Sequence, residues 1–134
     1  MSLLRETLKS VEVMCVTADL KPSGIKDSWD RLEHVLASLK RRKFYGAFFF
    51  PDGPYRACVA VLPGDEPAAM GLERWTFPGG LYLRRRLVDW QDDPDRIGIT
   101  FGEMSAQVHP DGERPNLEYY RRHDEVILYL PIQA

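Results

Sequence analysis

The residues best suited to chemistry lie near the C-terminal end of the chain. Glu118 is a single carboxylate between Leu117 and two tyrosines, Tyr119 and Tyr120, in a stretch that reads as a β-strand. Charged side chains are seldom left among apolar and aromatic neighbours unless water, a partner or a ligand satisfies them. A carboxylate faced by aromatic rings suits a cationic ligand, and a desolvated carboxyl also suits general acid or base catalysis. Glu118 is therefore the first candidate for a functional group, the alternative being a solvated residue on a half-exposed strand.

Strand alternation predicts which side chains accompany Glu118. Successive side chains of a strand point to opposite faces, so Glu118 and Tyr120 share one face, while Leu117 and Tyr119 share the other, against the helices. In the strand that follows Gly80, leucines alternate with Tyr82 in the same way. If those leucines face the helices, Tyr82 lies beside Glu118 and is a candidate ligand contact and catalytic partner.

Trp75 and the arginines around residue 85 complete the candidates. Trp75 would offer a stacking platform in the same cleft, although a packed core tryptophan explains it as well. Arg84 and Arg86 alternate with the leucines, and on the cleft side they would favour an anionic or amphipathic ligand. Surface ion pairs with nearby acids such as Asp89 are the alternative. The three histidines have no metal-ligand spacing, and no cofactor motif is present, so we expect neither a metal nor a cofactor.

Two stretches of the chain carry the same order of elements, β-α-β-β, over about residues 11–63 and 73–132. Each predicted helix has one apolar face. The two stripes are 72 positions apart: Ile25, Trp29, Leu32 and Leu36, then Ile97, Phe101, Met104 and Val108. This agreement predicts one α+β domain, 1–134, made of duplicated βαββ units. The units would form one antiparallel sheet with both helices on one face and a ligand cleft on the other.

The helix ends are predicted from local signals. The first stripe continues to Leu39, so that helix is expected to end in the basic run 40–43, where the helix dipole favours cations. Ser23 or Gly24 is available to cap its start. Asp93 is the expected N-cap of the second helix, with Pro94 at its first position.

Composition excludes several classes of protein. The chain has 134 residues, 44% of them hydrophobic and 28% charged, with a net charge of −2. This balance favours neither nucleic acid nor a membrane surface as the main partner. No apolar run is long enough to span a bilayer, and the N-terminus lacks a signal-peptide pattern. Cys15 and Cys58 have no metal or redox spacing, so we expect buried free thiols in a cytoplasmic protein.

Two segments resemble the GyrI-like family, the effector-binding domains of AraC- and MerR-type multidrug regulators. Phe77-Pro78-Gly79-Gly80-Leu81-Tyr82 is similar to its Pro-x-Gly-x-Tyr segment. Leu117-Glu118-Tyr119-Tyr120, with the later Leu130-Pro131-Ile132, is similar to its Glu-x-Tyr and Ile-Pro-Ile close. The duplicated βαββ order matches too, so the resemblance covers most of the chain.

The resemblance implies a free-standing small-molecule-binding protein. Its cleft between the two halves would take apolar, amphipathic or cationic molecules, with Glu118 as the inward glutamate. Some free-standing members of the family hydrolyse strained electrophilic molecules with that glutamate and a cleft tyrosine, which makes a hydrolase the second expectation. No sequence remains for a helix-turn-helix, so direct DNA binding is not expected. A separate protein partner, an inhibitor role or a homodimer stays open.

Overall fold

The computed structural model describes residues 4–133. Its strands are β1 (Leu4–Leu8), β2 (Val11–Ala18), β3 (Phe44–Phe48), β4 (Tyr55–Ala60), β5 (Glu73–Phe77), β6 (Gly80–Val88), β7 (Asn116–Arg122) and β8 (Glu125–Pro131). Its helices are α1 (Pro22–Val35), a short 3₁₀ helix (Trp90–Asp92) and α2 (Asp95–Ser105). The predicted α+β class is confirmed.

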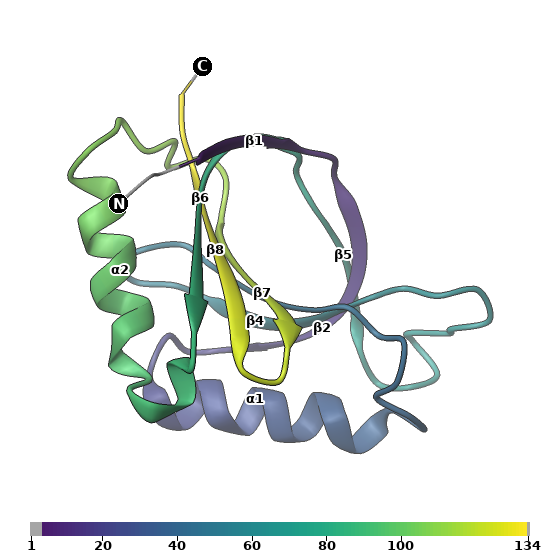
Figure 1. Cartoon of the computed structure of the whole chain (residues 1–134). Coiled ribbons are helices and arrows are strands. Elements are labelled where there is room, and N and C mark those ends of the chain that lie inside the picture. The colour runs from purple at the N-terminus through teal and green to yellow at the C-terminus, as the bar shows by residue number, and fades with distance from the viewer. Residues whose placement is uncertain (1–3, 134) are drawn as a thin grey trace.

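All eight strands form one antiparallel sheet, in the order β1-β6-β8-β7-β3-β4-β2-β5. The sheet is strongly curled, and both helices lie outside the curl (Figure 1). Strand β1 pairs with β6, not with its chain neighbour β2, and β5 pairs with β2. The connections that follow β1 and β5 lie in close contact. A Cβ added at Gly79 would collide with the backbone of Leu8 and Ser10, so the contact depends on a glycine at this position.

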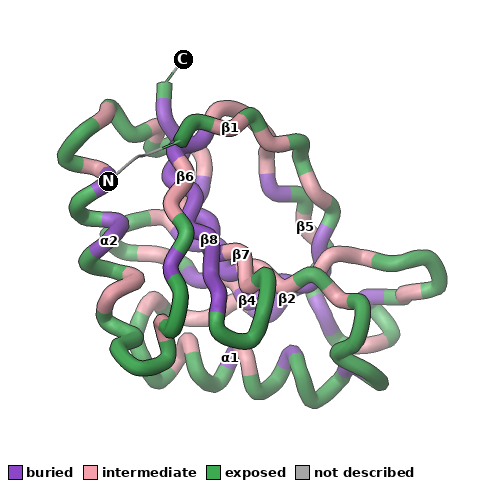
Figure 2. Tube along the Cα trace, in the orientation of Figure 1, coloured by how far each residue is buried: buried purple, intermediate pink, exposed green. Residues whose placement is uncertain are grey.

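Apolar side chains form one core on each face of the sheet. The helix-side core joins both helices to the sheet through residues such as Leu32, Phe101 and Leu128. The inner core fills the curl with residues such as Val13, Phe77 and Leu117. Buried positions follow the central strands, while the helices expose their outer sides (Figure 2). Both faces of the central strands are therefore buried, as expected for strands with near-continuous apolar runs.

The helix stripes are confirmed, but the helix ends differ from the prediction. Residues of both stripes pack in the helix-side core, although Leu36 is the C-cap of α1 and Val108 lies beyond the end of α2 at Ser105. Helix α1 ends at Val35 and not in the basic run, and Leu39 is exposed beyond it. Pro22 begins α1, and Lys21 is its N-cap. Pro94, not Asp93, is the N-cap of α2, and Asp93 is instead the C-cap of the 3₁₀ helix before it.

The stretch 11–63 carries β2-α1-β3-β4, while the stretch 73–132 carries β5 ahead of β6-α2-β7-β8 and so has one strand more than the predicted order. Their origin by duplication stays a prediction. The sequence did not predict β1, a short strand whose pattern reads as a polar lead. Cys15 and Cys58 are free and buried, and none of the described helices has the length and apolarity that crossing a membrane requires.

Candidate functional site

A cavity lies between the two helices, on the helix side of the sheet. Helix α1 packs against β2 and β4, and α2 packs against β8. The strands between these contacts, β7 and β3, are neighbours at the centre of the sheet. Trp29 of α1 packs edge-to-face on Phe44 of β3 and Tyr120 of β7. A pocket between the helices is lined by residues of α1, of α2 and of these strands, including Glu118 and Tyr120 of β7.

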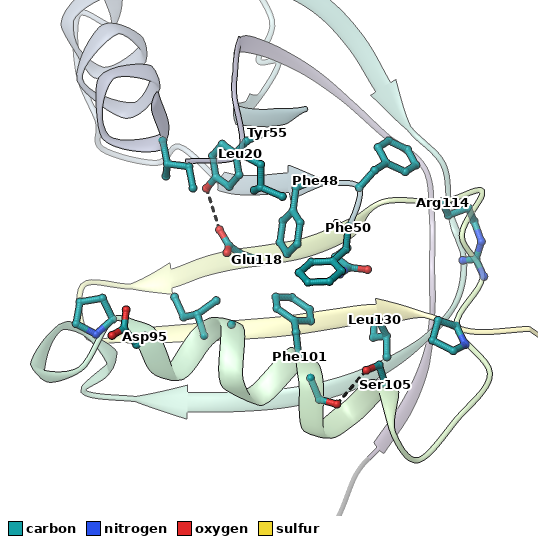
Figure 3. Close-up of a pocket in the computed structure, with 18 of the residues that line it drawn as sticks. Leu20, Phe48, Phe50, Tyr55, Asp95, Phe101, Ser105, Arg114, Glu118 and Leu130 are labelled. Atoms are coloured by element: carbon teal, nitrogen blue, oxygen red, sulfur yellow. Dashed lines mark hydrogen bonds between the residues drawn. The ribbon is translucent and has the colours of Figure 1, made fainter. Parts of the chain in front are cut away.

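The walls of this pocket are mainly apolar and aromatic. Its volume is about 640 Å³, within the range of small-molecule sites. Phe48 and Phe101 pack against each other in its wall as an edge-to-face pair, with ring centroids 5.3 Å apart (Figure 3). The turn after β3 adds Phe50, which is 77% exposed at the rim. Helix α2 contributes a wall that includes Gly98 and Gly102.

Glu118 is the polar centre of the pocket, and it is only 6% exposed. The hydroxyls of Tyr55 and Tyr120 each donate a hydrogen bond of 2.8 Å to its Oε1. The Trp29 indole N–H donates in turn to the Tyr55 hydroxyl at 2.9 Å. No described residue donates a hydrogen bond to the second carboxylate oxygen, Oε2. The carboxylate is thus held in place through Oε1 alone.

Burial shifts the proton equilibria of this group. It raises the pKa of Glu118, and the hydrogen bonds from Tyr120 and Tyr55 oppose that rise only in part. Burial, together with the nearby Glu118 charge, also raises the pKa of both tyrosines well above the ordinary value. The tyrosines therefore stay protonated as donors, and Glu118 takes up a proton more readily than an exposed carboxylate.

A glycine makes room for this cluster. Gly46 of β3 pairs with Glu118 across the sheet. A Cβ added at Gly46 would collide with the Glu118 carboxylate and the Tyr55 hydroxyl. A glycine inside a strand often marks such a close approach, and an isolated glycine in the aromatic run 44–50 was the signal that could have identified it.

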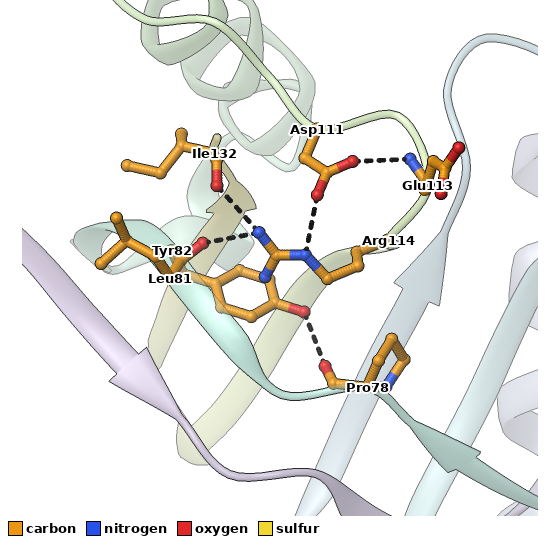
Figure 4. Close-up of polar contacts among 7 residues, drawn as sticks. All are labelled: Pro78, Leu81, Tyr82, Asp111, Glu113, Arg114 and Ile132. Atoms are coloured by element: carbon orange, nitrogen blue, oxygen red, sulfur yellow. Dashed lines mark hydrogen bonds and ion pairs between the residues drawn. The ribbon is translucent and has the colours of Figure 1, made fainter. Parts of the chain in front are cut away.

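Arg114 closes the other end of the pocket. Its Nε donates to Asp111 at 3.1 Å, and its Nη2 donates to the carbonyls of Leu81 and Ile132 at 3.1 and 2.8 Å (Figure 4). The guanidinium also lies 4.9 Å from the Tyr82 ring centre. Arg114 therefore ties the loop after α2 to β6 and β8, and Asp111 balances its charge.

The charged residues of the lining are mostly acidic. Its carboxylates are Asp95, Asp111 and Glu118, and Arg114 is the one basic side chain among the lining residues. Because Asp111 pairs with Arg114, Asp95 and Glu118 remain without a compensating charge in the wall. The lining therefore favours a cation over an anion. Among residues 4–133, no three His, Cys, Asp or Glu side chains are grouped as a metal site.

The structure brings together two of the predicted site residues, Glu118 and Tyr120, and separates two. Tyr82 and Trp75 belong to the inner core on the opposite face. The Tyr82 hydroxyl donates to the Pro78 carbonyl, and Trp75 lies under the Arg56 guanidinium. The expectation that Glu118 faces away from the helices is wrong: Leu117 takes the inner face, and Glu118 takes the helix side.

Arg84 and Arg86 are not among the residues that line the pocket. Arg84 lies 3.6 Å from Glu6, and Arg86 lies 2.8 Å from Glu125. Ion pairs therefore account for both arginines, with Glu6 and Glu125 as the acids in place of the predicted Asp89, Asp92 and Asp93. They give no support to an anionic ligand.

Sequence reasoning missed Tyr55 and Arg114. Tyr55 comes 63 positions before its partner Glu118, and as the first residue of a predicted strand it gave no local sign of that contact. Arg114 precedes the strand of Glu118, in a loop where an arginine is ordinarily solvated. Neither position has a periodic signal that could have indicated a pocket.

Comparison with solved structures identifies the fold. An integron cassette protein of Vibrio cholerae is similar over 98% of this chain and 95% of its own, with a TM-score of 0.78 and 15% identity. SAV2435 bound to tetraphenylphosphonium matches all of this chain and 95% of its own, with a TM-score of 0.66 and 12% identity. A hydrolase from Listeria innocua covers 98% of this chain and 91% of its own, with a TM-score of 0.63 and 10% identity.

No family model matches the sequence, and no curated protein matches it. At these identities the structural likeness shows a shared fold and no more. Of the proteins with this fold, SAV2435 is bound to tetraphenylphosphonium, and the Listeria innocua protein is described as a hydrolase.

Proposed function

We propose that this chain is a GyrI-like small-molecule-binding protein, and that its ligand occupies the pocket between α1 and α2. The observation that carries the proposal is Glu118, a 6% exposed carboxylate in an aromatic-walled cavity with one oxygen free of hydrogen bonds from described residues. Burying a charge is costly unless a partner compensates it. A lipophilic cation would supply that compensation.

The electrostatics and the walls support the same class of ligand. Glu118 and Asp95 leave the lining acidic, and aromatic rings attract cations by about 0.5–2 kcal/mol each. The tetraphenylphosphonium held by SAV2435 is a molecule of this kind. Tyr120 is the second ligand contact that we assign, because its hydroxyl and ring lie beside Glu118.

Matched cationic and neutral probes test this proposal. Isothermal titration would compare tetraphenylphosphonium with triphenylphosphine oxide, which has similar rings and no net charge. We expect the wild type to prefer the cation, and Glu118→Gln to weaken cation binding roughly 10- to 100-fold, because a charge-assisted contact is worth about 1.5–3 kcal/mol.

Glu103→Gln is the control, since it removes an exposed α2 carboxylate that does not line the pocket. It should leave both affinities unchanged. Absence of binding by both probes, or cation binding that is equal in Glu118→Gln and the wild type, would refute the proposal.

Hydrolysis of a strained electrophile is the second candidate. Its support is the Glu118–Tyr120 pair, in which a carboxyl of raised pKa lies 2.8 Å from a tyrosine hydroxyl inside the cavity. Such a carboxyl suits a general base, and the hydroxyl suits a donor to the opening oxygen. Tyr82 takes no part, because it lies in the inner core. Styrene oxide is a suitable substrate, and turnover that survives Glu118→Gln would exclude this mechanism.

A further inference from the structure

Helix α2 presents two glycines to the pocket. Gly98 and Gly102 are four residues apart, on one face of the helix, and both line the cavity. Apart from proline, glycine is the residue that least favours a helix interior. Two glycines one turn apart in an eleven-residue helix therefore need an explanation.

Packing within the protein does not supply one. A Cβ added at either glycine meets no heavy atom within 4 Å. Both residues have ordinary helical backbone, so no left-handed conformation requires glycine. Gly46 is the contrast, because its missing Cβ makes room for Glu118. Both glycines are exposed and both line the pocket, so the fold would accommodate side chains at 98 and 102.

The same cavity carries an independent sign of a ligand. Glu118 is buried in its floor, and its Oε2 receives no hydrogen bond from the described residues. The wall also holds Phe48 and Phe50, and Phe48 packs edge-to-face on Phe101 of α2 (Figure 3). The cavity thus has a charged floor, an aromatic wall and, on α2, a helix surface without side chains at two positions.

We propose that Gly98 and Gly102 determine the ligand specificity of this pocket by setting its width. The bare backbone of α2 serves as a flat wall, and a bulky ring system of the ligand lies between it and the aromatic wall. A slender chain has no need of that width. This inference rests on the proposed function and adds the shape of the ligand to its charge.

Two cationic probes of different width test the inference. Tetraphenylphosphonium is wide, and dodecyltrimethylammonium is slender. We expect Gly102→Leu to weaken binding of the wide probe roughly 10- to 100-fold through overpacking, and to change binding of the slender probe by less than about threefold. Ala106→Leu adds a leucine side chain at the C-cap of α2, outside the pocket lining, and it should change neither affinity.

Alanine variants separate a ligand role from a structural one. Gly98→Ala and Gly102→Ala should each raise the melting temperature by about 2–4 °C, because alanine favours the helix and its Cβ finds open space. A lowered melting temperature would show that the fold needs these glycines, and would overturn the inference.

The binding outcomes are equally decisive. Gly102→Leu that binds the wide probe as the wild type does, or that weakens both probes alike, would overturn the inference and leave the proposed function standing. A wild type that binds neither probe would overturn the proposed function itself, and the inference with it.

Discussion

Tyr55→Phe removes a hydroxyl that serves two partners in the centre of the molecule. Tyr55 is 1% exposed, so water does not readily replace the lost group. The change deletes a hydrogen bond to the Glu118 carboxylate and leaves the Trp29 indole N–H without its acceptor. The ring itself is kept, so no large cavity is created and the loss reports on the hydrogen bonds.

The expected cost is the sum of two contributions. A hydrogen bond to a charged group contributes about 1.5–3 kcal/mol, and an unsatisfied donor costs about 1 kcal/mol or more. The total is roughly 2.5–4 kcal/mol. At about 2.1 cal/mol/K per residue for the entropy of unfolding, this corresponds to a fall in melting temperature of roughly 9–14 °C for a chain of this length.

Tyr120→Phe is the matched variant, because it removes a bond to the same oxygen and leaves no other donor stranded. Tyr120 is also half-buried, so water can replace part of the loss. Its cost should be about 1–1.5 kcal/mol. Urea denaturation at pH 7, followed by circular dichroism with m-values compared, measures both. Equal losses in the two variants, or a loss below about 1 kcal/mol for Tyr55→Phe, would refute the reasoning.

Two further outcomes follow from the same cluster. Because burial raises the pKa of Glu118, its protonated form stabilises the fold fully below the unfolded-state pKa, and this stabilisation is lost as pH rises through the raised value. The stability of Glu118→Gln relative to the wild type should therefore increase between pH 4 and pH 8 in denaturation experiments, and a pH-independent difference would contradict this. Gly46→Ala should lower the free energy of unfolding by about 1–3 kcal/mol, because its Cβ overlaps Glu118 and Tyr55. Gly112→Ala, whose Cβ meets nothing within 4 Å, is the control, and equal effects of the two alanines would argue against the clash.

The predictable parts of the fold are those with a local period. The apolar stripes predict which residues of each helix are buried, because residues three or four positions apart lie on one face of a helix. The ends of α1 were not predictable in this way, since Leu39 continues the stripe beyond the last turn. Strand β1 was missed because a five-residue edge strand with two charges has no apolar run.

The sequence predicted two residues of the site, Glu118 and Tyr120, but not the face of the sheet on which they lie. Alternation correctly put Glu118 and Tyr120 on one face, but a period of two does not say which face the helices cover. That depends on how the strands align, and the alignment places Glu118 beside Gly46 and Leu128 on the helix side. Tyr55 could not be predicted as a partner, because the contact depends on the pairing of distant strands.

The pairing of β1 with β6, and of β5 with β2, has a consequence for synthesis of the chain. Strand β1 pairs with β6, which follows it by about 75 positions in the sequence. At roughly 5–20 residues per second, the ribosome completes this interval in about 4–15 s. During these seconds β1 has no strand to pair with, and one edge of β2 is unpaired until β5 has been synthesised. The nascent chain thus carries two open strand edges until more than half of it has been made, and these edges are where a chaperone, or another nascent chain, would meet it.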